Sequence, residues 1–383
     1  MKRNVGLLQI CAVLFLTAFV PSMVHAADVV VPRFELLTRG YPADGSLFLS
    51  TRADVDIAVE GGYKFGGGLG FSIEDPALED RESAPPATPQ EVERTLDRYL
   101  ALEYAEATIK SIADGPLNLT YFIGATETFG SGEDFPDLFG TAPFSSHYRG
   151  PLYAYGGTIY RGLYEVSGTG LGISTTPIND FAAFSVHTYQ DLRFEPGVYS
   201  SDARAAFNTR RLKAEVSAGA TYPAAEGGLY RGAVMAFFDT GTAGELFAQA
   251  ALPRWDPWSG DPLTLDDFYF LFEPRVRLDI FSAILTLFWR PSYYDHLPTG
   301  EDGALDANLR FQLGDYEQTR VRGGIETGLH YRPESDQQID VDTSPFISVT
   351  TGGVVWDFLV RTTVYPYEYE DSFEGYLGIR TAF

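Results

Sequence analysis

The chain has 383 residues, of which 45% are hydrophobic and 14% are aromatic, and its formal net charge at pH 7 is −24. This acidity disfavours nucleic acid and anionic surfaces as partners, because both require clustered Lys and Arg. Cys11 is the only cysteine, and it lies within an apolar segment near the N-terminus. Disulfides are therefore excluded from the rest of the chain.

The N-terminus has the pattern of a secretory signal peptide. Lys2 and Arg3 precede an apolar run over 5–20, and Val24-His25-Ala26 follows it. That run is shorter than the roughly 20 residues a helix needs to cross a bilayer. We therefore predict a signal peptide over 1–26, cleavage near Ala26, and a single mature domain over 27–383. Cleavage leaves 26 basic against 52 acidic residues.

The main signal in the mature chain is an apolar/polar period of two, repeated over segments as long as a tilted membrane strand, about 9 to 11 residues. From Leu305 to Leu313 the odd positions are apolar, and the intervening ones are Asp306, Asn308, Arg310 and Gln312. Similar runs lie at 47–60, 63–73, 275–280, 321–332 and 354–364. Strands of soluble sandwiches are mostly shorter, about 5 or 6 residues. We predict about 16 strands, within a range of 14–18.

The connections between these runs fall into two classes. Short reversals lie at 61–62, 113–116, 314–318 and 352–353, whereas long polar connections lie at 75–94, 130–150, 253–266, 291–304 and 333–344. This is the pattern of an all-β, antiparallel, up-and-down transmembrane barrel with short periplasmic turns and long extracellular loops. The acids in the long loops have two interpretations. They confer solubility, or they create a field that favours cations and bridges divalent ions to lipopolysaccharide.

Two segments have more than one interpretation. Thr88, Pro89 and Glu91 have the cap, first-turn proline and capping-box glutamate of a helix start, but a strand is also expected from residue 99 to 112. The segment 152–166 is rich in Gly and Tyr and alternates poorly. It is either a strand or a loop folded into the lumen.

The last run places Leu377, Ile379, Thr381 and Phe383 on one face and ends at Phe383. This ending resembles the C-terminal signal of Gram-negative outer-membrane barrels, carried here by Leu377, Ile379 and Phe383; Thr381 departs from the usual apolar residue. The resemblance is to porin-type barrels, without a specific family. It implies outer-membrane localisation, recognition by the barrel-assembly machinery, and contact with outer-membrane lipid and lipopolysaccharide. An unpaired backbone is costly in hydrocarbon, so the first and last strands are expected to pair.

A barrel of about 16 strands is wide enough to hold water, so inward charges are candidates for lining a pore. The predicted pore-lining residues are Arg275, Arg277, Asp306, Arg310, Arg320, Arg322, Glu326, Asp357 and Arg361. Asp54 and Asp56 belong to the same inward class. These charges either line the channel or form ion pairs that stiffen the wall. The leading functional prediction is passive diffusion of small hydrophilic solutes or ions, with selectivity set by pore radius and lining charge. A homo-oligomer is left open.

The main alternative is a non-conducting barrel that acts as an adhesin, receptor or structural protein; a hydrophobic-substrate transporter is less favoured. An enzyme is not expected, because the pairs His187/Asp191 and Asp295/His296 lack a nucleophile motif around them. No organic cofactor and no metal site are predicted. Asp336, Asp340 and Asp342 lack the order of a known calcium loop and are interpreted as a solvated acidic loop.

Overall fold

The computed structural model describes residues 28–43, 46–61, 64–75, 99–147, 162–194, 196–222, 229–291, 293–294, 297–298, 304–314, 320–333, 337–367 and 372–381. The predicted signal peptide and its cleavage site, the helix start at Thr88, most of the segment 152–166, His296, Asp336 and Phe383 lie outside these residues.

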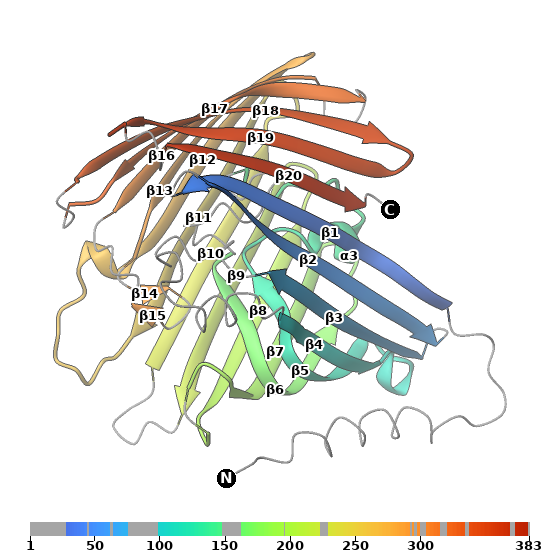
Figure 1. Ribbon diagram of the computed structural model, residues 1–383. Coiled ribbons are helices and arrows are strands. Elements are labelled where there is room, and N and C mark those ends of the chain that lie inside the picture. Colours follow the sequence, from blue (N-terminus) through green and yellow to red (C-terminus); the bar gives the residue numbers. More distant parts are fainter. Residues whose placement is uncertain are drawn as a thin grey trace, which may run out of the picture.

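The chain folds into one sheet of 18 strands (Figure 1). The first nine are β1 (Asp28–Ala43), β2 (Ser46–Gly61), β3 (Phe65–Asp75), β4 (Tyr99–Ile109), β5 (Leu117–Phe129), β6 (Tyr164–Thr175), β7 (Ala182–Asp191), β8 (Tyr199–Asn208) and β9 (Leu212–Tyr222). The other nine are β10 (Leu229–Asp239), β11 (Gly244–Trp255), β12 (Tyr269–Leu278), β13 (Phe281–Trp289), β16 (Leu305–Leu313), β17 (Val321–Tyr331), β18 (Ile339–Thr351), β19 (Val354–Tyr365) and β20 (Phe373–Thr381). A separate ribbon joins β14 (Tyr293–Tyr294) to β15 (Leu297–Pro298).

Every strand of the large sheet pairs antiparallel with the preceding and following barrel strands, and the sheet closes between β1 and β20. At the closure Leu36 lies opposite Ile379 and Thr38 opposite Leu377. In Figure 1 the blue β1 lies between β2 and the red β20. The predicted up-and-down barrel and the pairing of its first and last strands are therefore confirmed. The expected number of about 16 strands is low by two, and 18 is the upper end of the predicted range.

The two ends of the barrel differ in the length of their connections. One end carries the turns 110–116, 176–181, 209–211, 240–243, 279–280, 314–320 and 352–353, none longer than seven residues. At the turn 352–353 both glycines have positive φ, of 59° and 82°, a conformation that glycine adopts without a steric penalty. The other end carries the long connections 76–98, 130–163, 256–268 and 290–304. We call these the short-turn end and the long-loop end.

Burial alternates along the strands as the sequence predicts. In β16, Asp306, Arg310 and Gln312 are buried, whereas Leu309, Phe311 and Leu313 are exposed. Because the sheet is closed, the buried set faces the interior and the exposed apolar set faces outward, as the lipid-facing surface of a membrane barrel requires. Leu377 and Ile379 belong to the outward set, paired with Phe358 and Trp356.

Tyr331 and Tyr365 are exposed on the outer face near the long-loop end, and Trp289 is half-buried there. None of the helices among the described residues has both the length and the apolar character needed to span a bilayer.

Candidate functional site in the barrel interior

The connection between β5 and β6 folds into the barrel instead of projecting from it. Its described part, residues 130–147, we call the inner segment. Phe135 and Phe144 of this segment are 0% and 3% exposed, and Phe144 packs against Phe237 and Phe247 on the inward faces of β10 and β11. The sequence pattern predicts that 130–150 is one of the loops outside the cell. That assignment is wrong for the inner segment, because its aromatic side chains are buried among inward-facing side chains of the barrel wall.

A short helix and three glycines shape the inner segment. Pro136 stands in the first turn of α3 (Phe135–Phe139), where its missing N–H costs nothing. Gly140 ends the helix with a φ of 64° and donates its N–H to the carbonyl of Pro136 at 2.8 Å. Gly130, with a φ of 73°, turns the chain inward where a Cβ would lie 2.4 Å from the side chain of Leu163. Gly132 also has a positive φ.

Buried polar groups of the wall hold both ends of the inner segment. At its start, the Gly130 N–H donates to Glu215 at 2.6 Å, and Gln249 donates to the Gly130 carbonyl. At its end, Glu273 accepts from the Ser146 hydroxyl at 2.7 Å and from the His147 N–H at 3.0 Å. A buried hydrogen bond to a charged group contributes about 1.5–3 kcal/mol. The segment is therefore fixed to β9, β11 and β12.

Arg275 completes the second anchor. Its guanidinium lies 2.7 Å from Glu273 and donates to the carbonyls of Phe144 at 3.2 Å and Ser145 at 2.7 Å. Burial, followed by the positive charge of Arg275, lowers the pKa of His147 well below its ordinary value. His147 is therefore neutral at pH 7.

An apolar cluster fills the space between the inner segment and one side of the barrel. Its buried members are Phe135, Phe144, Leu163, Ala206, Met235, Phe237, Phe247, Ala251, Tyr269, Leu271 and Phe288. They come from the β5–β6 connection and from β8 and β10–β13. Phe144 stacks on Phe237 with ring centroids 4.7 Å apart and meets Phe135 edge-on at 5.0 Å. This side of the interior is a packed core.

Arg204 on β8 joins the inner segment to the wall at a third point. Its guanidinium contacts Glu127 of β5, Asp134 of the inner segment and Glu215 of β9, the last at 2.8 Å. Three carboxylates thus share one guanidinium whose side chain is 3% exposed. Burial raises the pKa of Asp134 above its ordinary value, although Arg204 opposes this. We call Arg204, Glu127, Asp134 and Glu215 the Arg204 group; its formal charge is −2.

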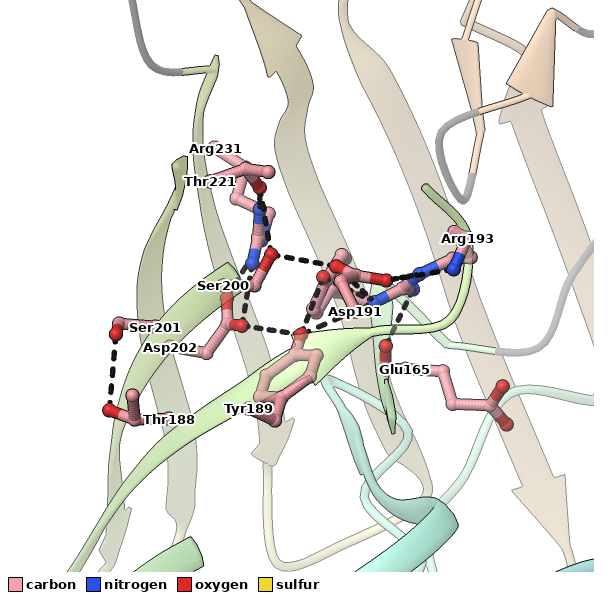
Figure 2. Close-up of polar contacts among 11 residues, drawn as sticks. Glu165, Thr188, Tyr189, Asp191, Arg193, Ser200, Ser201, Asp202, Thr221 and Arg231 are labelled. Carbon is pink, nitrogen blue, oxygen red and sulfur yellow. Dashed lines mark hydrogen bonds and ion pairs between the residues drawn. The ribbon is translucent and has the colours of Figure 1, made fainter. Parts of the chain in front are cut away.

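A second buried network braces β6–β10 (Figure 2). Asp202 accepts hydrogen bonds from Nε and Nη2 of Arg231, at 2.7 and 2.6 Å, and from the hydroxyl of Tyr189 at 2.7 Å. Arg193 pairs with Asp191 at 2.9 Å and donates to the Glu165 carbonyl at 2.7 Å. In Figure 2 the Tyr189 hydroxyl lies between Asp202 and the Arg193 side chain. Each aspartate here has its own arginine, so the network is balanced.

Most of the predicted pore-lining residues are buried. Arg275, Asp306, Arg310, Arg322, Glu326 and Asp357 are all at most 7% exposed. Ion pairs join Asp306 to Arg290 at 2.6 Å, Arg310 to Glu326 at 3.2 Å and Asp357 to Arg380 at 2.9 Å. Arg361 is half-buried against Asp342, whereas Arg277 and Arg320 are exposed near the short-turn end. The six buried residues face the interior, and a role of the nine residues in lining a pore stays a prediction.

A face rich in carboxylates lies on the inner side of β1–β4. We call Glu35, Asp54, Asp56, Glu103 and Glu106 the acidic face. Two arginines lie among them: Arg33 is within 3.8 Å of the first three, and Arg52 is 3.0 Å from Asp54 and 3.4 Å from Glu103. The glycines of β3 make room here, because a Cβ on Gly70 would lie 2.2 Å from the ring of Tyr104. Asp54 and Asp56 are predicted from the sequence as inward charges, whereas Glu35, Glu103 and Glu106 are not.

Two cavities adjoin the inner segment. One, of about 240 Å³, lies between it and the wall and is lined by Glu106, Glu127, Asp134, Asp137 and His187 among others. The second, of about 410 Å³, opens where residues 139–142 meet the turn residues Asp180, Thr209 and Arg210. The inner segment therefore leaves the wall after β5 and reaches the short-turn end. A smaller cavity of about 10 Å³ lies between the apolar cluster and the network of Figure 2.

The residues considered for catalysis or metal binding have other partners. His187 lies 3.3 Å from Glu127, while Asp191 bonds Arg193 and Ser200, so His187 and Asp191 do not pair with each other. Asp340 pairs with Arg332, and Asp342 with His330 and Arg361. Among the described residues no group of three or more His, Cys, Asp or Glu is arranged to hold a metal ion.

The sequence matches no protein-family model and no curated protein. Solved outer-membrane barrels are nevertheless similar in structure. Wzi of Escherichia coli, an outer-membrane protein involved in group 1 capsule assembly and a carbohydrate-binding β-barrel, has a TM-score of 0.53 at 11% identity, covering 100% of this chain and 90% of its own. OpdK of Pseudomonas aeruginosa, solved with vanillate, has a TM-score of 0.53 at 9% identity, covering 92% of this chain and 98% of its own.

OccAB2 of Acinetobacter baumannii has a TM-score of 0.50 at 11% identity, covering 94% of this chain and 99% of its own. The chain has the fold of an outer-membrane β-barrel. At these identities the likeness concerns the fold alone, so the function is inferred from the geometry of the interior.

Proposed function

We propose that the protein is an outer-membrane channel for the passive diffusion of small hydrophilic solutes or ions. The observation that carries the proposal is the asymmetry of the interior. One side is a packed core built around the inner segment, whereas charged side chains on β1–β4 remain partly exposed, Glu103 by 39% and Arg33 by 44%. Inward charges that keep contact with water fit a water-filled passage better than a solid barrel core.

The proposed location follows from the outer surface. Large apolar side chains cover the outward faces of the strands, and the backbone is paired around the whole barrel. Both properties are required of a sheet that sits in hydrocarbon. Removal of residues 1–26, assembly by the barrel-assembly machinery, and contact with lipid and lipopolysaccharide are parts of the same proposal. We further propose that the barrel performs no catalysis.

Single-channel recording tests the proposal. Residues 27–383, refolded in detergent and checked for a heat-dependent shift on a gel, are added to a planar bilayer in KCl. Stepwise conductance is expected from the folded protein and not from the heat-denatured protein. A folded, heat-modifiable barrel that never conducts would refute the channel.

A second candidate is a non-conducting barrel that binds carbohydrate at its long-loop end. It is favoured by the likeness to Wzi, described as a carbohydrate-binding β-barrel. This chain also exposes rings at that end: Trp255 and Trp258 are 40% and 56% exposed and both lie about 6 Å from the ring of Tyr230. Calorimetric titration with capsular oligosaccharides, compared between the protein and its Trp258→Ala variant, separates this candidate from the channel. Binding that Trp258→Ala abolishes, in a barrel that does not conduct, would favour it.

A further inference from the structure

Four buried ion pairs lie along the part of the interior wall that runs from β8 to β17. Arg231 pairs with Asp202, Arg275 with Glu273, Arg290 with Asp306 and Arg310 with Glu326. In each pair both side chains are at most 6% exposed. Charges that are matched and removed from water contribute little to the potential felt by a passing ion.

The charges on the other side of the interior are not balanced. The five carboxylates of the acidic face have two arginines, Arg33 and Arg52, among them. Glu106 receives a hydrogen bond from the Thr126 hydroxyl at 3.1 Å. With the three carboxylates that share Arg204, the described residues of this surface comprise eight acids and three guanidiniums, a formal charge of −5.

Open space lies beside this unbalanced surface. The side chains of Asp54, Asp56 and Glu127 are 17–19% exposed, and those of Asp134 and Glu103 are 33% and 39% exposed. The 240 Å³ cavity is lined by Glu106 of the acidic face and by Glu127 and Asp134 of the Arg204 group. The exposure of these side chains, their unbalanced charge and the adjoining cavity all favour the side of the acidic face as the side open to water.

We propose that permeating ions cross the barrel between the inner segment and the acidic face of β1–β4, and that the channel therefore favours small cations over anions. This inference rests on the proposed channel function and adds to it the route and the sign of the permeant charge. A carboxylate beside a narrow aqueous path raises the local concentration of cations and lowers that of anions. The Arg204 group extends this acidic surface toward the inner segment.

The test is the reversal potential of single channels across a KCl gradient, measured on residues 27–383. The wild-type channel is expected to be cation-selective. The double variant Asp54→Asn/Asp56→Asn should lower the permeability ratio of K⁺ to Cl⁻ by roughly threefold for each charge, given a path about 6 Å away and physiological salt. Glu103→Gln, which changes a more exposed side chain, provides a second variant in case the first does not fold.

A matched control removes two aspartate charges elsewhere. Asp114 lies in the turn after β4 with its side chain 88% exposed, and Asp261 is exposed in the connection before β12. Asp114→Asn/Asp261→Asn should change the permeability ratio less than the acidic-face variants do. Equal changes in the two double variants would show that net charge sets selectivity, not the route.

The outcomes separate the two proposals. Channels that are unselective or anion-selective would overturn the route and leave the channel function standing. Anion selectivity would instead favour a route through the 410 Å³ cavity, whose lining includes Arg210 and Lys213. Absence of channels from the folded protein would overturn both proposals. Cation selectivity that is unchanged in both folded acidic-face variants would overturn the route.

Discussion

Replacing Arg204 with glutamine is expected to loosen the inner segment. Arg204 is the shared partner of Glu127, Asp134 and Glu215, and its side chain is 3% exposed. Removing one partner of a buried ion pair costs about 3–5 kcal/mol. The lower end of that range applies, because Glu127 and Asp134 are 19% and 33% exposed and can be hydrated. We therefore expect Arg204→Gln to lower the free energy of unfolding by about 3 kcal/mol.

Residues 27–383 contain no cysteine, so a single reporter thiol can be introduced. Asp137 is exposed in α3 of the inner segment and suits this purpose. A spin label on an Asp137→Cys background should become more mobile when Arg204→Gln is added. Arg361→Gln is the matched control: it removes an inward arginine paired with Asp342 at 2.8 Å on β18 and β19. It should lower the stability of the barrel in urea without changing the mobility of the label.

Two results would refute this reasoning. An unchanged spectrum in a folded Arg204→Gln barrel would show that Arg204 does not hold the inner segment. Equal mobilisation by Arg361→Gln would show that the label reports general loosening of the barrel. Adding Asp134→Asn to Arg204→Gln should recover part of the lost stability, because one carboxylate without its partner is then removed.

Three further predictions concern the same segment. Phe144→Ala should cost about 3–5 kcal/mol in urea unfolding, because it empties a buried ring site; a change below 1 kcal/mol would contradict the packing described for it. Glu273→Gln should increase proteolysis near Ser146, because Glu273 accepts from both Ser146 and the His147 N–H; unchanged cleavage would argue against this anchor. Burial raises the pKa of Asp134 above its value in the unfolded chain, so protonation of this side chain stabilises the fold. The contribution is complete below about pH 4 and is lost as pH rises through the raised pKa. The label at Asp137→Cys should therefore become more mobile between pH 4 and pH 7, and Asp134→Asn should reduce that change; an unaltered profile would exclude Asp134 as its source.

The wall of the barrel could be predicted from the sequence because a strand alternates its side chains between two faces with a period of two. The alternation from Leu305 to Leu313 corresponds residue by residue to the inward and outward faces of β16. Strands with small residues on both faces carry a weaker signal. In β8, for example, Ser201, Ala203 and Ala205 face outward opposite Ser200 and Ala206.

The interior could be predicted only in part. The alternation along the strands predicts that Arg310 and Asp54 both face inward. It does not tell which of the two side chains faces a packed core and which faces water. That difference depends on the inner segment, whose position is set by contacts between residues far apart in sequence, such as Ser146 with Glu273. A signal was present in the sequence: Phe135, Phe139 and Phe144 stand in a connection otherwise rich in polar residues and glycine. Three aromatic residues so placed favour burial.

The pairing of β1 with β20 also has a consequence for how the chain folds. Leu36 and Ile379 are neighbours in the wall although almost the whole described chain separates them. Contacts between such distant residues form slowly, because a very long loop must close first. Until β20 arrives, β1 and β19 each present an edge of unpaired amides, which in a membrane is costly and in water invites aggregation. We therefore expect refolding to end in a single slow, all-or-none step, and a chain truncated before Phe373 to remain open and prone to aggregate.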